Sequence, residues 1–480
     1  MILKLSVIIA FALLIVIVGI MGLRKTRSFT DFLLGGRQVG PWLTAFTYGT
    51  AYFSAVLFIG FAGKIGWQFG LSGLWVAAGN AVLGVLGVWW IMGKRIRSMS
   101  HELQVHTMPE YFERRYNSRG LRLYASICIF VFFIPYSAAV FIGLSYLFQT
   151  TFGIGYTAAL LYMGGLTTLY LALGGYKSMT MIDAVFGMIM IVGVAVLLGS
   201  TLGRAGGLDT LIDRLTAFHP QLAEVIGPPG WWPLFSLVFL TSVAPFAMPQ
   251  LVQKFYAIRD NRSIRIGMTA STLFCVLIAG TAYFVGASAR VFLNPEMNPA
   301  AFLNGQPVFD ALMPEMLANV VTPSLSVLML LLILSASMST LAALVLISSS
   351  SVVKDLYAGF VNQHATDTQL TRLMRLFSAV FVALSVILAY VKPATIVSIL
   401  GISWGAIGAA FLGPFVWGLF WRRCSKAAAV ISSVVGLGVC IWLYATGMPS
   451  PQAGTIGMIL SLVLPPLIAA VTSPSSVLTD

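Results

Sequence analysis

The chain has 480 residues, of which 58% are apolar and only 9% carry a charge. Soluble domains carry about 25% charged residues, so a water-soluble protein could not bury this much apolar surface. The composition excludes an ordinary soluble enzyme or binding module and indicates an all-α, polytopic membrane protein, with no polar stretch long enough for a soluble domain.

Apolar runs of about 17–25 residues, the length that crosses a bilayer, predict about thirteen transmembrane helices. The first run is followed by "RKTR" and lacks the short apolar core and small-residue cleavage site of a signal peptide, so it is predicted to be retained. The expected spans are 2–22, 40–66, 70–93, 123–149, 156–174, 179–203, 231–253, 266–289, 323–351, 374–391, 394–420, 427–447 and 454–473.

Lysine and arginine predict the orientation of these spans. With the N-terminus outside and the C-terminus in the cytoplasm, 22 of the 28 Lys and Arg fall in inner loops. The net charge of +13 is therefore interpreted as a topology signal facing the cytoplasmic leaflet of a cell membrane, and nucleic acid is not expected as a partner.

Spans two to eleven divide into two sets of five with opposite orientation, as in transporters built from inverted repeats. The first span of each set looks breakable: 40–66 contains four glycines after residue 48, and 231–253 contains Pro245 and Pro249. The predicted units are an extra N-terminal helix and basic loop, a first repeat, an outer loop, a second repeat and two extra helices, over 1–39, 40–203, 204–230, 231–420 and 421–480. The longer outer segments, 204–230 and 290–322, are predicted either to form short helices over the outer mouth or to act as linkers.

Asp183 is the only acidic residue inside a predicted span, close to its cytoplasmic end. An intramembrane carboxylate suggests a functional site, here an ion or proton relay. Alternatively, Asp183 anchors the inner end of its span, paired with Lys177.

The ninth span carries hydroxyls in two groups, in "SASMSTLAALVLISSSS" (335–351). Ala336, Ser339, Thr340 and Ala343 follow the i, i+3, i+4, i+7 spacing and share one helical face. Oxygens gathered on one face suit a hard cation, although a hydroxyl in a membrane helix often bonds its own i−4 carbonyl instead. The second group, 348–351, is predicted to be a hydrated helix terminus.

Enzymatic function is not expected. All four histidines lie in predicted loops, and neither a nucleophilic triad nor a Walker-type "GxxxxGK" occurs. An ion gradient is then the expected source of energy.

Several segments together resemble the sodium/solute symporter family over nearly the whole chain. "MSTLAALVLISSSSVVKDLY" (338–357) resembles the family signature, and "MPQLVQKFYA" (248–257) and "ISWGAIGAAFLGPFVWGLFWRR" (402–423) resemble segments of sodium/proline symporters. "SAVLFIGFAGKIGWQFGLSG" (54–73) is similar to the broken first core helix, nearer to pantothenate than to sugar symporters. The resemblance implies a ten-helix inverted-repeat, leucine-transporter-like core whose repeats each begin with a broken helix.

The resemblance also implies a sodium (Na+) site made of two carbonyls from the first broken helix and one carbonyl and two hydroxyls from the ninth span. Matched motif to motif, these are Thr50 and Phe53, then Ala336, Ser339 and Thr340. Relatives with a second sodium use further hydroxyls one turn on, where this chain has alanines at 342 and 343, so one sodium is expected.

The expected function is sodium-coupled uptake of a small organic solute by alternating access, with no obligate protein partner. A carboxylate-bearing solute (pantothenate, a monocarboxylate or an amino acid) is favoured because half-helix N-termini at the breaks attract anions. Proton coupling through Asp183 is one alternative; an ion channel or a transporter-like sensor is another, although the tail "SPSSVLTD" offers no signalling domain. The substrate pocket is expected, by position, at Tyr52, Leu57, Thr241, Pro245 and Trp404.

Overall fold

The structure is a computed structural model that describes residues 2–26, 28–322 and 325–469. Within these residues it is nearly all helical, apart from one two-stranded ladder, β1 (Phe302–Leu303) with β2 (Gln306–Pro307). Eleven described helices are long and apolar enough to cross a membrane, which confirms the polytopic class. The count of thirteen is not confirmed.

The two counts differ because neighbouring helices join. The segment Val56–Glu102 is helical nearly throughout and spans two predicted segments, while the piece before it, α3 (Pro41–Tyr52), has only 12 residues. Likewise α9 (Tyr156–Ala205) covers two predicted spans and is interrupted only by Gly175, at φ 59° and ψ −162°. The predicted end of the last span at 473 and the tail after it lie outside the described residues.

The first half of the chain contains the first predicted repeat. Its helices are α1 (Ile2–Lys25), α2 (Phe29–Leu34), 3-10 η1 (Gly35–Arg37), α3, π-helical η2 (Val56–Phe61), α4 (Ala62–Phe69), 3-10 η3 (Gly70–Gly73), α5 (Leu74–Gly79), π-helical η4 (Asn80–Met92), α6 (Gly93–Glu102), α7 (Met108–Tyr116), α8 (Arg119–Phe152), α9, α10 (Leu208–Phe218) and 3-10 η5 (Pro220–Leu222).

The second half contains the second predicted repeat and the last two helices. Its helices are α11 (Trp231–Val243), 3-10 η6 (Ala244–Phe246), α12 (Pro249–Ala257), α13 (Asn261–Ala287), α14 (Ala289–Phe292), 3-10 η7 (Pro299–Ala301), α15 (Phe309–Val320), α16 (Ser326–Ser350), π-helical η8 (Ser351–Val361), α17 (Asp367–Val391), α18 (Ile396–Phe420), α19 (Lys426–Ala445) and α20 (Ser450–Ala469). The exact limits of the two repeats stay a prediction.

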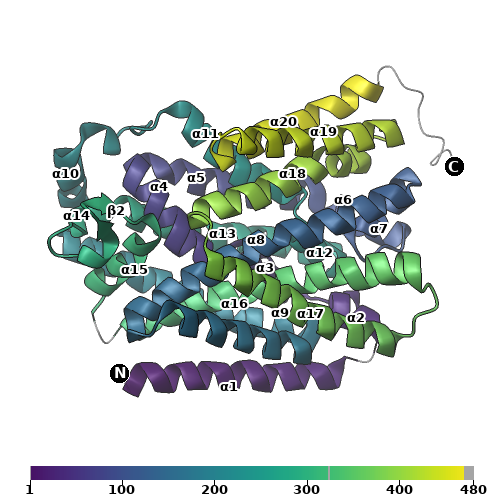
Figure 1. The fold of residues 1–480 in the computed structure, drawn as a ribbon, viewed down its shortest axis with the longest axis horizontal. Coiled ribbons are helices and arrows are strands. Elements are labelled where there is room, and N and C mark those ends of the chain that lie inside the picture. The colour runs from purple at the N-terminus through teal and green to yellow at the C-terminus, as the bar shows by residue number, and fades with distance from the viewer. Residues whose placement is uncertain (1, 27, 323–324, 470–480) are drawn as a thin grey trace.

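The short helices gather at the two ends of the long ones (Figure 1). One end carries α10, α14, β2 and α15 together with the start of α1, and the other carries α2, α6 and α7. The segments 204–230 and 290–322 therefore do form short helices, as one of the two readings predicted.

Both predicted helix breaks are present. Helix α3 ends at Tyr52, Phe53 is extended at φ −110° and ψ 128°, and helical structure resumes at Ala55, whose N–H donates to the Ser337 hydroxyl of α16 over 3.2 Å. The second break lies between Val243 and Pro249 and contains only the 3-10 turn η6. Each break frees backbone carbonyls that need other partners.

Helix α16 lies in the interior, and its most apolar window is 94% buried. The chain stays helical beyond it, through η8, for eleven residues. The prediction of a hydrated terminus at Ser348–Ser351 is therefore wrong, because the helix does not end there and all four serines are at most 1% exposed.

Candidate functional site

The first break and α16 meet in a buried cluster of oxygen atoms. The Thr340 hydroxyl oxygen lies 3.4 Å from the carbonyl oxygens of Thr50, Ala51 and Phe53, and 3.1 Å from that of Ala336. Oxygen ligands about 2.4 Å from a cation the size of Ca²⁺ or Na⁺ lie about 3.4 Å apart when they subtend a right angle. The spacing of this cluster is therefore that of a cation shell.

Ser339 extends the same cluster. Its hydroxyl donates to the Thr50 hydroxyl over 2.8 Å, and the Thr50 hydroxyl in turn donates to the Phe46 carbonyl over 2.7 Å. The structure thus brings together all five residues named for sodium, each at most 2% exposed. It adds the Ala51 carbonyl, which a motif match could not single out because any residue type supplies a carbonyl.

The alternative role of a helix hydroxyl, a hydrogen bond to the carbonyl four residues earlier, is also present at this site. The Ala336 carbonyl is the i−4 carbonyl of Thr340, and at 3.1 Å it is the nearest of the four. A hydroxyl has one proton and donates to one acceptor at a time, so this bond accounts for one carbonyl and leaves the three at the break to be explained.

Asp183 lies next to the Thr50 and Ser339 hydroxyls. Its carboxylate is fully buried and lies close to the hydroxyls of Thr47, Thr50 and Ser339. Lys254 is the cation within electrostatic reach of it. The alternative partner Lys177 instead forms an ion pair with Asp31, at 2.8 Å, so the anchoring pair with Asp183 was wrongly predicted.

Lys254 was wrongly counted among the inner loop cations. It lies inside α12, is 1% exposed, and its ammonium faces the Tyr176 ring with 5.0 Å to the centroid. The sequence did carry a signal: a proline at 249 suits the first turn of a helix, which then includes residue 254.

A small cavity lies beside the oxygen cluster, between the two breaks. Four of the five predicted pocket residues line it: Tyr52, Leu57, Thr241 and Trp404. The space open to water is only about 30 Å³, roughly the volume of one water molecule, so a solute can enter only if side chains move apart. The Tyr52 hydroxyl closes one side by donating to the Thr241 carbonyl over 2.7 Å.

Pro245 does not line this cavity, contrary to the prediction. The prediction rested on position along the seventh span, but α11 ends at Val243, so Pro245 does not continue the helical face of Thr241. Pro245 is buried in the turn that forms the second break.

Trp404 contributes the clearest polar group of the cavity. Its indole N–H has no hydrogen-bond acceptor among the described residues, although the Tyr136 hydroxyl lies near it. Its ring makes edge contacts with the rings of Tyr52 and Tyr136, at 6.0 and 5.8 Å between centroids. A buried donor without an acceptor favours a ligand that carries an acceptor oxygen.

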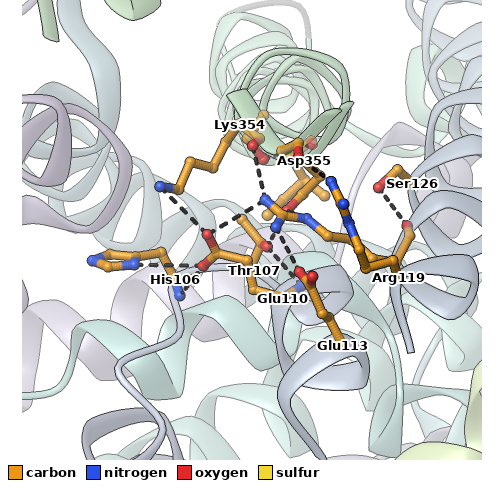
Figure 2. A network of polar contacts seen from close by, with 12 residues as sticks. His106, Thr107, Glu110, Glu113, Arg119, Ser126, Lys354 and Asp355 are labelled. Carbon is orange, nitrogen blue, oxygen red and sulfur yellow. Dashed lines mark hydrogen bonds and ion pairs between the residues drawn. The ribbon is translucent and has the colours of Figure 1, made fainter. Parts of the chain in front are cut away.

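A network of polar side chains fastens α7 and the start of α8 to η8 (Figure 2). The Thr107 hydroxyl donates to the buried Asp355 carboxylate over 2.6 Å, and Arg122 lies 3.6 Å from the same carboxylate. Glu110 lies 3.4 Å from Lys354 and 3.7 Å from Arg122. The predicted span ended at residue 351, but the helix continues through η8, and Asp355 is completely buried there.

Glu110 is the titratable centre of this network. Burial raises the pKa of its carboxyl, but the hydrogen bond from His106 and the charges of Lys354 and His106 outweigh burial and lower the pKa to about 2. Glu110 is therefore ionised at neutral pH, and the network fixes the helix that carries Ser339 and Thr340 to its neighbours.

A buried oxygen cluster between a broken helix and α16, with a second broken helix across the neighbouring cavity, is the arrangement of an ion-coupled secondary transporter. The sequence matches the sodium:solute symporter family over residues 32–436, which is most of the chain. The protein belongs to this family.

Curated relatives agree along nearly their whole length. The sodium/pantothenate symporter of Escherichia coli (strain K12) is 29% identical over 450 residues, 91% of this chain and 89% of that protein. The osmoregulated proline transporter of Bacillus subtilis (strain 168) is 26% identical over 477 residues, 95% of this chain and 92% of that protein.

Solved structures confirm the fold. A sodium-coupled sialic acid symporter superposes with a TM-score of 0.83 at 17% identity, covering 99% of both chains. MhsT in complex with L-phenylalanine superposes with a TM-score of 0.55 at 13% identity, covering 90% of this chain and 98% of that one. The predicted inverted-repeat, leucine-transporter-like core is thereby confirmed.

The family and the fold together establish the general activity. The protein is a multi-pass, sodium-coupled solute symporter of the cell membrane, with sodium as the coupling ion and a small solute as the cargo.

Proposed function

We propose that this chain transports a small carboxylate-bearing solute together with sodium by alternating access. The candidate solutes are pantothenate, a monocarboxylate or an amino acid. The observation that carries the sodium half is the convergence of four carbonyl oxygens within 3.4 Å of the Thr340 hydroxyl.

In this proposal sodium binds between α16 and the first break. The carbonyls of Thr50, Phe53 and Ala336 and the hydroxyls of Ser339 and Thr340 are its ligands. Sodium then holds the broken helix against α16 and stabilises the outward-open form. One sodium is transported per cycle, because the positions one turn on are alanines.

The solute half rests on the cavity between the breaks. Trp404 offers an unpaired N–H there, and Tyr52, Leu57 and Thr241 form the rest of the predicted contact surface. Helix N-termini that begin at the breaks add favourable partial positive charge for an anion. Relatives named for pantothenate and for proline, which both bear a carboxylate, support this class.

The proposed orientation places the N-terminus outside and the C-terminus in the cytoplasm. The end with α10, α14 and α15 is then the outer end, and the network around Glu110 lies at the inner end. The distribution of Lys and Arg supports this assignment.

Uptake into proteoliposomes tests the proposal. Purified protein is supplied with radiolabelled pantothenate, lactate and proline under an inward sodium gradient, with potassium as the control cation. Sodium should stimulate uptake of at least one acid, and Ser339→Ala with Thr340→Ala should abolish the stimulation. Sodium-independent uptake in the parent, or sodium currents without solute, would contradict symport by this site.

Proton coupling through Asp183 is the second candidate. It is favoured by the complete burial of that carboxylate, the three hydroxyls around it and the nearby cation of Lys254. Uptake driven by a pH gradient without sodium, and lost in Asp183→Asn, would support this candidate against the first.

A further inference from the structure

A separate cavity opens at the end of the molecule where α10 and α15 lie. It has a volume of about 280 Å³ and lies between α4, α11, α18 and the start of α20. This is close to the lower size of ligand-binding pockets, about 300 Å³. We call it the vestibule.

The vestibule lies directly above the cavity between the breaks, because the same three helices line both. Phe61, at the end of η2, lines the deeper cavity, and Lys64 and Ile65, in the following α4, line the vestibule. Along α11 the deeper residue is Thr241, and Leu237 is one turn further out.

Helix α18 also lines both cavities, at positions that lie successively further from the breaks. Trp404 and Leu400 line the deeper cavity, and Val397 lines the vestibule. A helical turn rises about 5.4 Å, and all three helices step in the same direction, away from the breaks. A solute that leaves the vestibule inward therefore reaches the deeper cavity first.

Lys64 supplies the charge of the vestibule. It is the only ionisable side chain among the described residues of its lining, and it forms no ion pair among the described residues. Its ammonium lies 5.6 Å from the centroid of the Phe309 ring. The side-chain amides of Gln68 and Gln452 also face the cavity and make no hydrogen bond in the part of the chain that is described.

We propose that the vestibule is a first binding site for the carboxylate of the solute, with Lys64 as its cation and Gln68 as a hydrogen-bond donor. This inference rests on the proposed uptake of a carboxylate-bearing solute. The solute then moves about two helical turns inward to the Trp404 N–H. A cation in a recessed, mostly apolar cavity raises the local concentration of anions and so speeds their capture.

Among the described residues, Asp310 is the carboxylate that competes for Lys64. It lies within electrostatic reach, but its two oxygens accept the N–H of Ile396, over 3.2 and 3.3 Å, at the start of α18. Its oxygens are held by the start of α18 and form no ion pair with Lys64 among the described residues, which leaves the hydrogen-bonding sites of the Lys64 ammonium available to a solute.

The charge of the vestibule can be measured without transport. Gln452→Cys introduces a reactive thiol in the cavity wall, while the four native cysteines are all buried. We compare its rates of modification by the anionic reagent MTSES and the cationic reagent MTSET, in the Lys64 protein and in Lys64→Gln. A sphere of 280 Å³ is about 8 Å across, which sets the distance between the Lys64 charge and the thiol. Over that distance in low salt, loss of one positive charge should lower the ratio of the MTSES rate to the MTSET rate about five-fold.

Two controls separate this effect from misfolding. Lys64→Arg keeps the charge and should keep the ratio. Leu208→Cys, a half-exposed position on α10 at the same end of the molecule, should give a ratio that Lys64→Gln leaves unchanged. A ratio at Gln452→Cys that is insensitive to Lys64, as expected if Asp310 cancels its charge, would overturn the proposal.

Protection from modification tests binding itself. Pantothenate or lactate at 10 mM should slow labelling of Gln452→Cys at least about three-fold, whereas the neutral alcohols panthenol and propane-1,2-diol should not. The protection should disappear in Lys64→Gln and persist in Lys64→Arg. Protection that survives Lys64→Gln, equal protection by the alcohols, or no protection by either acid would overturn the carboxylate site. Labelling requires neither sodium nor uptake, so this site and the sodium site can fail independently.

Discussion

Replacing Thr340 by valine removes one proposed sodium ligand with little change in shape. A bond from a neutral group to a charged one contributes about 1.5–3 kcal/mol, so loss of this oxygen should weaken sodium binding about 10- to 100-fold. The other proposed ligands, Thr50, Phe53, Ala336 and Ser339, remain in place. Thr340→Ser keeps the hydroxyl and should bind sodium within a few-fold of the parent.

Sodium-dependent thermal stability measures this loss without knowledge of the solute. At a sodium concentration 100 times its dissociation constant, binding stabilises the parent by about 2.7 kcal/mol. The same concentration stabilises a variant with ten-fold weaker binding by about 1.4 kcal/mol, and one with 100-fold weaker binding by about 0.4 kcal/mol. Melting curves in sodium, against potassium at equal ionic strength, should therefore show a smaller shift for Thr340→Val.

Ser350→Ala is the matched control on the same helix. Its hydroxyl is also buried but donates to its own Ile347 carbonyl over 2.8 Å, away from the break. It should leave the sodium shift unchanged. An unchanged shift in Thr340→Val, or an equal loss in Ser350→Ala, would refute the assignment.

Three further outcomes are expected. Trp404→Phe removes the N–H that is proposed to bond an anionic solute, and it should raise the KM for the proposed acid about ten-fold, measured by uptake in proteoliposomes. Folding lowers the pKa of Glu110 from 4.5 to about 2, so its ionised form stabilises the folded state, and Glu110→Gln should cost about 3 kcal/mol of stability above pH 4.5. This contribution is lost as pH falls from 4.5 towards 2, and melting curves measured against pH would show the loss. Burial raises the pKa of Asp310 to about 6, so the parent should lose up to about 3 kcal/mol of folding stability relative to Asp310→Asn as pH rises from 4 through 6. Equal dependence of stability on pH in the two proteins would contradict this.

The sequence predicted the features that a single helix determines. Bilayer thickness dictates the length of apolar spans, and proline removes a backbone donor, so the spans and the second break could be located along the chain. The shared face of Ala336, Ser339 and Thr340 follows from helical periodicity alone. Which carbonyls would oppose that face could not be predicted without a family resemblance, because backbone oxygens leave no trace in residue identity.

The failures arose where a helix ended elsewhere than expected. Ser348–Ser351 and Asp355 are buried because η8 extends α16, and Lys254 is buried because α12 begins before it. Pro245 does not line the cavity because α11 ends two residues before it. Helix ends depend on tertiary partners as much as on local sequence, so they are the least certain part of a sequence-based prediction.

The first break connects everything proposed for transport. Thr50 and Phe53 offer carbonyls to the sodium cluster, and Tyr52, between them, bonds the Thr241 carbonyl in the cavity wall. Further along the same segment, Lys64 lines the vestibule. Tyr52 lies between these two carbonyls in the chain, so a solute that opens the cavity by shifting the backbone at Tyr52 changes the sodium site. Reciprocity then requires that sodium changes solute affinity by the same factor.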